Sequence, residues 1–263
     1  MTTFRDNLLA GKTAFVAGGT SGINLGIAKR FAELGAKVAV AGRDPDKARR
    51  AAEEIGPGAI GLSGDVRDYA AIRGVMETVA DRLGPMDIVI SGAAGNFLAP
   101  VLGMSANAFR TVVDIDLNGT FNVFRGCHDL LKRPGASLIA ITAGQAVNAS
   151  ALQAHACAAK AGINQLIRVL ALEWGPDVRV NGISPGPIAD TEGMKRLAPD
   201  AGTRQAHHDR IAMKRWGTIA EVAESAVFLC SPAAGYVTGT ILDCDGGSQI
   251  GDASRRDLAK GMA

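Results

Sequence analysis

The most constraining feature of the sequence is a regular alternation between short apolar runs and longer segments with helical periodicity. The apolar runs are rich in valine and isoleucine, and they are apolar throughout. Strands of this kind are buried on both faces, which is typical of a parallel sheet covered by helices. The alternation therefore predicts a doubly wound α/β domain, in which ligands bind at the carboxyl ends of the strands.

The predicted elements run from one end of the chain to the other. The strands are Thr13–Ala17, Lys37–Ala41, Ala59–Leu62, Asp87–Ile90, Ser137–Thr142, Val178–Ser184 and Thr240–Asp243. The helices are Ile23–Leu34, Ala48–Glu54, Ala70–Leu83, Ala106–Leu131, Ala154–Trp174 and Ala220–Leu229. No composition break or long linker divides the 263 residues, so we expect a single domain, 1–263, with helices on both faces of the sheet. Polar, weakly periodic Asp190–Lys214 is expected to form a short helical substrate lid, and Asp252–Ala263 a frayed tail.

Composition and charge exclude several classes of protein. A net charge of +2 gives no electrostatic reason to expect a nucleic-acid partner. The four cysteines are scattered, without metal-ligand spacing, so we expect reduced thiols and no metal site. The sequence shows no signal peptide, no apolar run long enough to cross a membrane, and no peroxisomal Ser-Lys-Leu ending. We therefore expect a soluble, cytoplasmic protein.

A glycine-rich turn, Gly18-Gly19-Thr20-Ser21-Gly22, follows the first predicted strand and opens a helix. Glycines at such a turn allow backbone N–H groups to approach a pyrophosphate at the positive end of the helix. Any tight turn favours glycine, but the position within a βαβ unit favours dinucleotide binding.

The end of the second predicted strand indicates which dinucleotide is bound. An acidic residue there would accept hydrogen bonds from the ribose 2′-hydroxyl, but the sequence is Ala41-Gly42-Arg43. A small residue followed by arginine leaves room and positive charge for a 2′-phosphate, which favours NADPH over NADH. A solvated surface arginine is the alternative interpretation. Asp65 and Val66, after the third strand, are expected to bracket the adenine, although Asp65 could equally be a turn residue.

Several motifs together resemble the short-chain dehydrogenase/reductase family from about Leu8 to Gly247. They are Gly18-x-x-x-Gly22, Asp65, Ala93-Ala94-Gly95, Lys160, Asn181 and Pro185-Gly186. The resemblance implies a Rossmann-type sheet, a nicotinamide cofactor and a homotetramer built on the long helices before and after the fifth strand. The residues expected to bind NADP(H) are Gly18, Thr20, Ser21, Gly22, Ile23, Arg43, Asp65, Val66, Gly92, Ala93, Ala94, Lys160, Pro185, Gly186, Ile188 and Thr191.

A finer resemblance is to the 2,4-dienoyl-CoA reductase branch, particularly the peroxisomal type. It is carried by Ala93–Phe97, Asp114–Phe121, Gln153-Ala154-His155, Pro185–Ile188 and Thr191-Glu192-Gly193. Like that branch, the chain lacks the family's tyrosine four residues before the lysine, because Ala156 stands there. The family's catalytic serine falls at Ala143 and its asparagine at Asp116, which fits the branch. The third glycine of the turn falls at Asn24, which fits neither pattern.

The missing tyrosine narrows the chemistry. A ketone reductase must protonate the oxygen at the carbon that receives hydride, and loss of its acid should cost about 10²–10⁴ in rate. In a conjugated dienoyl thioester, hydride enters the far end of the diene, the charge spreads to the thioester oxygen, and the proton goes to carbon. Such a site must hold an oxyanion but does not need a phenol.

Within the resemblance we assign roles to two catalytic residues. Lys160 is expected to bind the nicotinamide ribose hydroxyls and to lower the pKa of a nearby group or water. Asp116 is expected to orient a water that protonates the substrate carbon. Ile188 and Thr191 would hold the nicotinamide carboxamide. The expected substrate residues are Asn96, Phe97, Thr142 and Gln145, which the sequence does not rank as thioester donors.

Other interpretations stay open at this point. Lys160 could be a surface lysine, Asp116 a helix-kinking residue and His155 a packing residue. The chain could instead be a carbonyl reductase or alcohol dehydrogenase with a displaced acid, for example His155 or a lid residue, or a catalytically silent NADPH-binding protein. A basic set on the lid could bind the phosphates of an acyl-CoA substrate or be solvated; it comprises Lys195, Arg196, Arg204, Lys214 and Arg215.

Overall fold

The computed structural model describes residues 4–198 and 200–254. These residues contain a seven-stranded sheet of order β3-β2-β1-β4-β5-β6-β7, in which all neighbouring strands are parallel. The strands are β1 (Thr13–Ala17), β2 (Lys37–Gly42), β3 (Ile60–Ser63), β4 (Ile88–Ser91), β5 (Ala136–Ile141), β6 (Val178–Pro185) and β7 (Ile241–Cys244). The predicted parallel sheet is confirmed.

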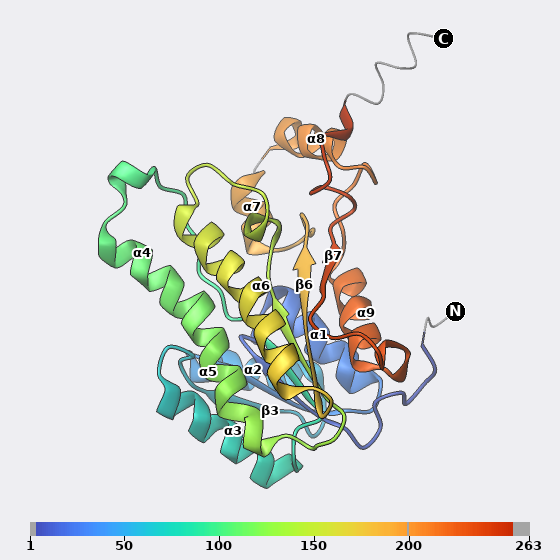
Figure 1. The fold of residues 1–263 in the computed structure, drawn as a ribbon. Coiled ribbons are helices and arrows are strands. Elements are labelled where there is room, and N and C mark those ends of the chain that lie inside the picture. Colours follow the sequence, from blue (N-terminus) through green and yellow to red (C-terminus); the bar gives the residue numbers. More distant parts are fainter. Residues whose placement is uncertain (1–3, 199, 255–263) are drawn as a thin grey trace.

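Helices cover both faces of this sheet (Figure 1). They are α1 (Gly22–Glu33), α2 (Pro45–Ile55), α3 (Tyr69–Leu83), α4 (Ala106–Val113), α5 (Gly119–Cys127), α6 (Ala154–Trp174), α7 (Glu192–Leu197), α8 (Ala201–Arg210) and α9 (Ile219–Cys230). Side chains of α3, α5 and α6 pack into one buried core, and those of α1, α2 and α9 into the other. Consecutive β1 residues Phe15 and Val16 enter opposite cores, as the alternation of side chains along a strand requires.

The order of the strands creates a crevice at one edge of the sheet. From β1 the chain builds outward through β2 and β3, and it then returns to place β4 on the other side of β1. The loops after β1 and β4 therefore diverge, and ligands of doubly wound sheets bind at this switch point. The turn before α1 and the segment Gly92–Gly95 after β4 both lie there.

The predicted helix Ala106–Leu131 is not regular. The chain forms α4, then a π-helical turn over Asp114–Asn118, then α5 and a short 3₁₀ turn over His128–Leu130. Single π turns widen a helix by one residue and are frequent at functional sites. Here the widened turn contains Asp116, whose Oδ1 accepts a hydrogen bond from the backbone N–H of Gly95 at 2.7 Å.

The segment Asp190–Lys214 contains the two short helices α7 and α8, which lie beyond the carboxyl end of β6 (Figure 1). Its base is fixed by a parallel bridge between Ile188 and Gly217. Of the expected tail, residues 255–263 lie outside the described residues, as does Pro199 of the lid. Within the described part of the chain, no helix combines the length and apolar character needed to span a membrane.

Candidate active site

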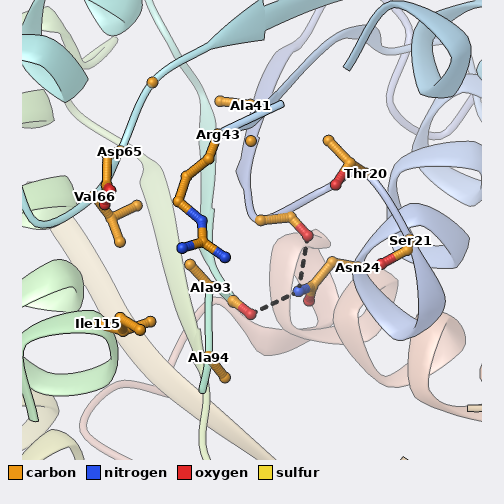
Figure 2. A pocket seen from close by; sticks show the side chains of 14 residues that line it. Thr20, Ser21, Asn24, Ala41, Arg43, Asp65, Val66, Ala93, Ala94 and Ile115 are labelled. Atoms are coloured by element: carbon orange, nitrogen blue, oxygen red, sulfur yellow. Dashed lines mark hydrogen bonds between the residues drawn. The ribbon is translucent and has the colours of Figure 1, made fainter. Parts of the chain in front are cut away.

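Two adjoining clefts open at the carboxyl edge of the sheet. The first lies at the switch point between β1 and β4, and Figure 2 shows its lining side chains. Its lining residues are Gly18, Thr20, Ser21, Asn24, Ala41, Gly42, Arg43, Gly64, Asp65, Val66, Gly92, Ala93, Ala94 and Ile115. It therefore brings together most of the residues predicted to bind a dinucleotide.

The turn between β1 and α1 suits an anionic ligand. Gly18 has a φ of 76°, and a Cβ there would lie 2.6 Å from the backbone nitrogen of Ala93, so no larger residue fits. Gly22, with a φ of 57°, borders open space. Helix α1 has no side-chain cap and no acidic residue in its first turn. The N–H groups at its positive end are thus available to a pyrophosphate.

This uncapped start contrasts with other helices of the chain. Helix α2 begins at Pro45 and is capped by Asp44, whose carboxylate accepts hydrogen bonds from the backbone N–H groups of Asp46 and Lys47. Helix α9 carries a capping box formed by Thr218 and Glu221. Unlike these two helices, α1 leaves the N–H groups of its first turn without a side-chain acceptor, next to the first cleft.

The end of β2 presents a cation to the same cleft. Figure 2 shows the Arg43 side chain extending from β2 into the cleft. Gly42 makes room for the glycine-rich turn, because a Cβ there would lie 2.7 Å from Cγ2 of Thr20. No carboxylate occupies the position from which a ribose 2′-hydroxyl would be bound. These residues fit a 2′-phosphorylated dinucleotide.

Asp65 does not present a free carboxylate to the cleft. Its oxygens accept hydrogen bonds from the backbone nitrogen, Nε and Nη2 of Arg67, at 3.0 Å, 3.0 Å and 2.5 Å. The side-chain hydrogen bonds from Arg67 hold the pKa of Asp65 below its ordinary value. Asp65 and Val66 line the cleft, so their contact with an adenine stays a prediction.

The second cleft has a volume of about 440 Å³ and shares Ala94 with the first. Its lining residues are Ile23, Ala94, Gly95, Asn96, Asp116, Ile141, Thr142, Ala143, Gly144, Gln145, Ala156, Lys160, Pro185, Gly186, Pro187, Ile188, Thr191, Gly193, Met194, Ser248 and Gln249. Eleven of the residues predicted to bind cofactor or substrate or to act in catalysis meet here around Ala156: Ile23, Ala94, Asn96, Asp116, Thr142, Gln145, Lys160, Pro185, Gly186, Ile188 and Thr191.

A buried ion pair forms the polar centre of this cleft. Lys160 Nζ lies 3.1 Å from Asp116 Oδ2, and the side chains are only 9% and 1% exposed. Lys160 also donates to the carbonyl oxygen of Ile141 at 3.0 Å, at the carboxyl end of β5. Buried charges are costly unless they are paired and hydrogen-bonded, and both conditions hold here. Lys160 is therefore not a surface lysine.

The π turn fixes Asp116 opposite Lys160. Thr120 Oγ1 donates to the carbonyl oxygen of Asp116 at 2.7 Å and accepts from Ser91 Oγ at 3.1 Å. With the bond from Gly95 to Oδ1, the backbone and the carboxylate of Asp116 are both held. The sequence indicated the importance of Asp116 but not the irregular turn that orients it.

The polar side chains around Ala156 are already engaged to different degrees. Thr142 Oγ1 donates its single hydrogen to Asn164 Oδ1 at 2.7 Å. Asn96 Nδ2 donates to Gln153 Oε1 at 2.6 Å, and Gln145 Nε2 reaches the same oxygen at 3.4 Å. A side-chain amide nitrogen carries two hydrogens, so Asn96 and Gln145 each keep one for a ligand, whereas Thr142 does not.

His155 is not placed as a substitute acid. The side chain is fully buried, its Nδ1 accepts from the backbone nitrogen of Ala156 at 2.8 Å, and it is absent from the cleft lining. Its ring packs edge-on against Phe97, with ring centroids 4.2 Å apart. Phe97, predicted as a substrate residue, likewise does not line the cleft and is 40% exposed beside it.

Several lining residues were not predicted as site residues, among them Asn24 in the first cleft and Ser248 and Gln249 in the second. Gln249 Nε2 donates to Ser184 Oγ at 2.9 Å and to Asp243 Oδ1 at 3.1 Å, which holds the segment after β7 against the cleft. The turn sequence Asp245-Gly246-Gly247 shows that the chain bends there, but it gives no indication of what the next side chains contact.

The lid contributes to the cleft near its base. Thr191 Oγ1 donates to the carbonyl oxygen of Ile188 at 2.8 Å and caps α7, whose Met194 lines the cleft. Much of the basic set has partners within the protein: Lys195 pairs with Glu192, and Arg215 forms two hydrogen bonds to Glu221. Lys214 Nζ donates to the carbonyls of Asp209 and Ala253. The side chain of Arg196 lies outside the described part of the chain.

Comparisons with known proteins agree with this geometry. A family model described as enoyl-(acyl carrier protein) reductase matches residues 17–249. The chain is 41% identical to a protein of Pongo abelii named peroxisomal 2,4-dienoyl-CoA reductase [(3E)-enoyl-CoA-producing], over 94% of this chain and 87% of that protein. It is 34% identical to a probable 2,4-dienoyl-CoA reductase [(2E)-enoyl-CoA-producing] of Bacillus subtilis, over 91% and 97%. A solved short-chain dehydrogenase of Bacillus anthracis matches with a TM-score of 0.80 and 35% identity, over 90% of this chain and 96% of that one.

Proposed function

Because the chain belongs to the short-chain dehydrogenase/reductase family, we propose that it reduces conjugated enoyl thioesters of the 2,4-dienoyl-CoA type with NADPH. The observation that carries the proposal is the buried Asp116–Lys160 pair in a cleft that has Ala156 where the family has its acid. Relatives named 2,4-dienoyl-CoA reductases match over most of the chain, which supports the choice of substrate.

A nicotinamide cofactor follows from the family and the fold. The finer proposal is NADPH, supported by Arg43 in the first cleft and by the absence of an acidic residue at the end of β2. The α1 N-terminus and the glycine turn would hold the pyrophosphate, and Lys160 with Ile188 and Thr191 would hold the nicotinamide half. When bound, the nicotinamide supplies a hydride.

The residues of this chain must first stabilise the negative charge that develops on the substrate oxygen. Hydride addition at C5 of a 2,4-dienoyl thioester leaves a dienolate whose negative charge reaches the thioester oxygen. Asn96 and Gln145 line the cleft, and we propose that the spare hydrogens of their amides bind that oxygen. Gln153 fixes both amides, so little reorganisation is needed when the charge develops.

Proton delivery to carbon is the second demand. We assign it to a water oriented by the Asp116 carboxylate. The ammonium of Lys160, which lies 3.1 Å from Asp116 Oδ2, makes that water more acidic. One proton from this water reaches C2, which gives a 3-enoyl thioester, or C4, which gives a 2-enoyl thioester. We propose the 3-enoyl product, which the name of the more similar relative specifies.

Two alternative functions remain from the sequence. The alternative of a carbonyl reductase with a displaced acid loses one of its candidate acids, because His155 is buried and packed on Phe97. A silent NADPH-binding protein has no need to keep two charges buried and paired at the centre of a cleft. Each alternative function predicts a different outcome in an assay with purified substrates.

Assembly and location are further parts of the proposal. Apolar side chains are exposed on the helices before and after β5: Phe109 and Phe121 on α4 and α5, and Val169 and Leu172 on α6. They support a homotetramer, which molecular mass in solution would test. The chain matches relatives named peroxisomal, and the cytoplasmic location expected from the sequence stays a prediction.

The test is consumption of NADPH by the purified protein with a 2,4-dienoyl-CoA and, separately, with a 3-ketoacyl-CoA of equal chain length. We expect turnover with the dienoyl thioester only. Turnover with the ketoacyl thioester alone would favour a carbonyl reductase. Tight NADPH binding with no turnover on either substrate would favour a silent binding protein.

A further inference from the structure

Asn24 lies where the cofactor-binding turn meets the end of β4. It occupies the first turn of α1, its side chain lines the first cleft, and it is only 9% exposed. Its Nδ2 donates to the carbonyl oxygen of Gly18 at 3.2 Å and to that of Gly92 at 2.8 Å. Figure 2 shows both bonds converging on this one amide from the two sides of the cleft.

The orientation of this amide is fixed by its partners. Both hydrogens of Nδ2 are used, and the reversed orientation would set Oδ1 against two carbonyl oxygens. Oδ1 itself is buried without a hydrogen-bond partner among the described residues. Burying an unpaired acceptor costs free energy that offsets part of what the two hydrogen bonds contribute to folding. The two hydrogen bonds and the unpaired acceptor thus act in opposite directions on stability, and both constrain the local geometry.

The surrounding backbone is shaped around the same side chain. A Cβ on Gly92 would lie 2.3 Å from Asn24 Oδ1 and 2.4 Å from Nδ2, so glycine at position 92 is a consequence of asparagine at position 24. On the opposite side, Gly18 packs closely on Ala93. The two turns and the amide thus interlock at the floor of the first cleft.

We propose that Asn24 is a positioning residue for the dinucleotide: its amide ties the turn after β1 to the end of β4 and sets the cleft in its binding shape before the cofactor arrives. This inference rests on the dinucleotide binding proposed above. Preorganisation lowers the cost of ordering the cleft on binding, so its loss appears as weaker affinity. Asp116 and Lys160, to which we assign proton delivery, line the second cleft, whereas Asn24 lines the first.

The test measures NADPH affinity without substrate, by titration of the nicotinamide fluorescence. In Asn24→Leu, which keeps the approximate size but not the hydrogen bonds, and in Asn24→Gly, which removes the side chain, we expect the Kd to rise on the order of tenfold. The urea midpoint of the cofactor-free protein should stay near that of the wild type, and kcat at saturating NADPH should fall less than about twofold. Asn24→Gly provides a second test in case the leucine variant does not fold.

A double-mutant cycle with Gly92→Ala isolates the contact. Alone, Gly92→Ala forces a Cβ into Asn24 and should weaken NADPH binding, whereas in the Asn24→Gly background it should cost much less. Unchanged Kd values in both Asn24 variants, or additive effects in the cycle, would overturn the inference while leaving the proposed function intact. A wild-type protein that binds neither NADPH nor NADH would overturn the proposed function and the inference with it.

Discussion

Asp116 and Lys160 compensate each other's burial. Each lies almost completely out of water, where an unpaired charge is costly. Their separation of 3.1 Å and the bonds from Gly95 N–H and to the Ile141 carbonyl make up for that loss of solvation. Removing one charge therefore leaves the other buried and uncompensated. A variant at either position should for this reason change the shape of the side chain as little as possible.

Asp116→Asn tests the carboxylate with minimal change of shape. We expect kcat with a 2,4-dienoyl-CoA to fall about 10²–10⁴-fold, because general acid–base assistance of that size is lost with the water that Asp116 orients. NADPH affinity, measured by fluorescence titration, should change much less. Asp114→Asn, on the same π turn but outside the cleft lining, is the matched control. A rate for Asp116→Asn equal to that of the control would remove Asp116 from the mechanism.

We propose that Arg43 sets the preference for NADPH over NADH. Arg43→Glu replaces a cation in the first cleft with a carboxylate that repels a 2′-phosphate and can accept from a ribose hydroxyl. We expect the ratio of kcat/KM for NADPH to that for NADH to drop at least about tenfold, a change of about 1.4 kcal/mol in discrimination. Steady-state kinetics with each cofactor measure this ratio. Arg49→Glu, on α2 away from that cleft, is the control, and an equal drop there would show only a general charge effect.

At the scale of elements, the N-termini of α1 and α9 have different roles: the first is open to a ligand, and the second stabilises the fold. The start of α1 is left without a side-chain cap and faces the cofactor cleft. The start of α9 is closed by the Thr218–Glu221 capping box, and Arg215 binds Glu221 through two further hydrogen bonds. The first arrangement reserves N–H groups for a ligand, whereas the second fixes a helix that packs against α1 and the sheet.

The capping box of α9 should make the stability of the protein depend on pH. The hydrogen bonds from Arg215, together with those from the backbone and side chain of Thr218, lower the pKa of Glu221 from 4.5 to about 2. A carboxyl whose folded pKa lies below its unfolded pKa stabilises the protein above the unfolded value, and this contribution is lost as the pH falls toward 2. Since the side chain is 43% exposed, solvent screens most of the shift, and we expect roughly 0.5–1 kcal/mol.

Urea unfolding of the wild type and Glu221→Gln measures this contribution. At pH 7 the variant should be less stable by that amount, and the difference should shrink as the pH falls below about 4.5. Glu53→Gln, an exposed carboxylate paired with Arg49 on α2, provides the comparison for a side chain outside a cap. A gap that stays constant down to pH 3 would show that ionisation of Glu221 is not its source.

At the scale of the whole molecule, the sequence predicted the sheet because parallel strands buried on both faces leave a strong pattern. The positions of Lys160 and Ala156 on one helix follow from that pattern and the family motifs. The π turn at Asp116 could not be predicted, because it depends on the N–H of Gly95, a contact between distant segments. Likewise, Gln153 as the fixed partner of Asn96 and Gln249 as part of the cleft depend on packing across loops.

The same limit explains Asn24. In the sequence it is a departure from a glycine pattern, with no indication of what its side chain contacts. In the folded chain it bonds to the carbonyls of Gly18 and Gly92 and joins the two sides of the cleft. A local motif reports which backbone shapes are allowed, but not which distant carbonyl oxygens a new side chain will meet.

The central claim is that hydride enters the substrate far from the oxygen that carries the charge, which is why Ala156 suffices where a phenol would otherwise stand. The most direct measurement is the position of deuterium in the product formed from 2,4-dienoyl-CoA and NADPH deuterated at C4 of the nicotinamide, with both C4 epimers tested. The account predicts deuterium at C5, and, with unlabelled NADPH in deuterated water, one solvent deuteron at C2. Deuterium from the cofactor at C3, or at the thioester carbon, would contradict it.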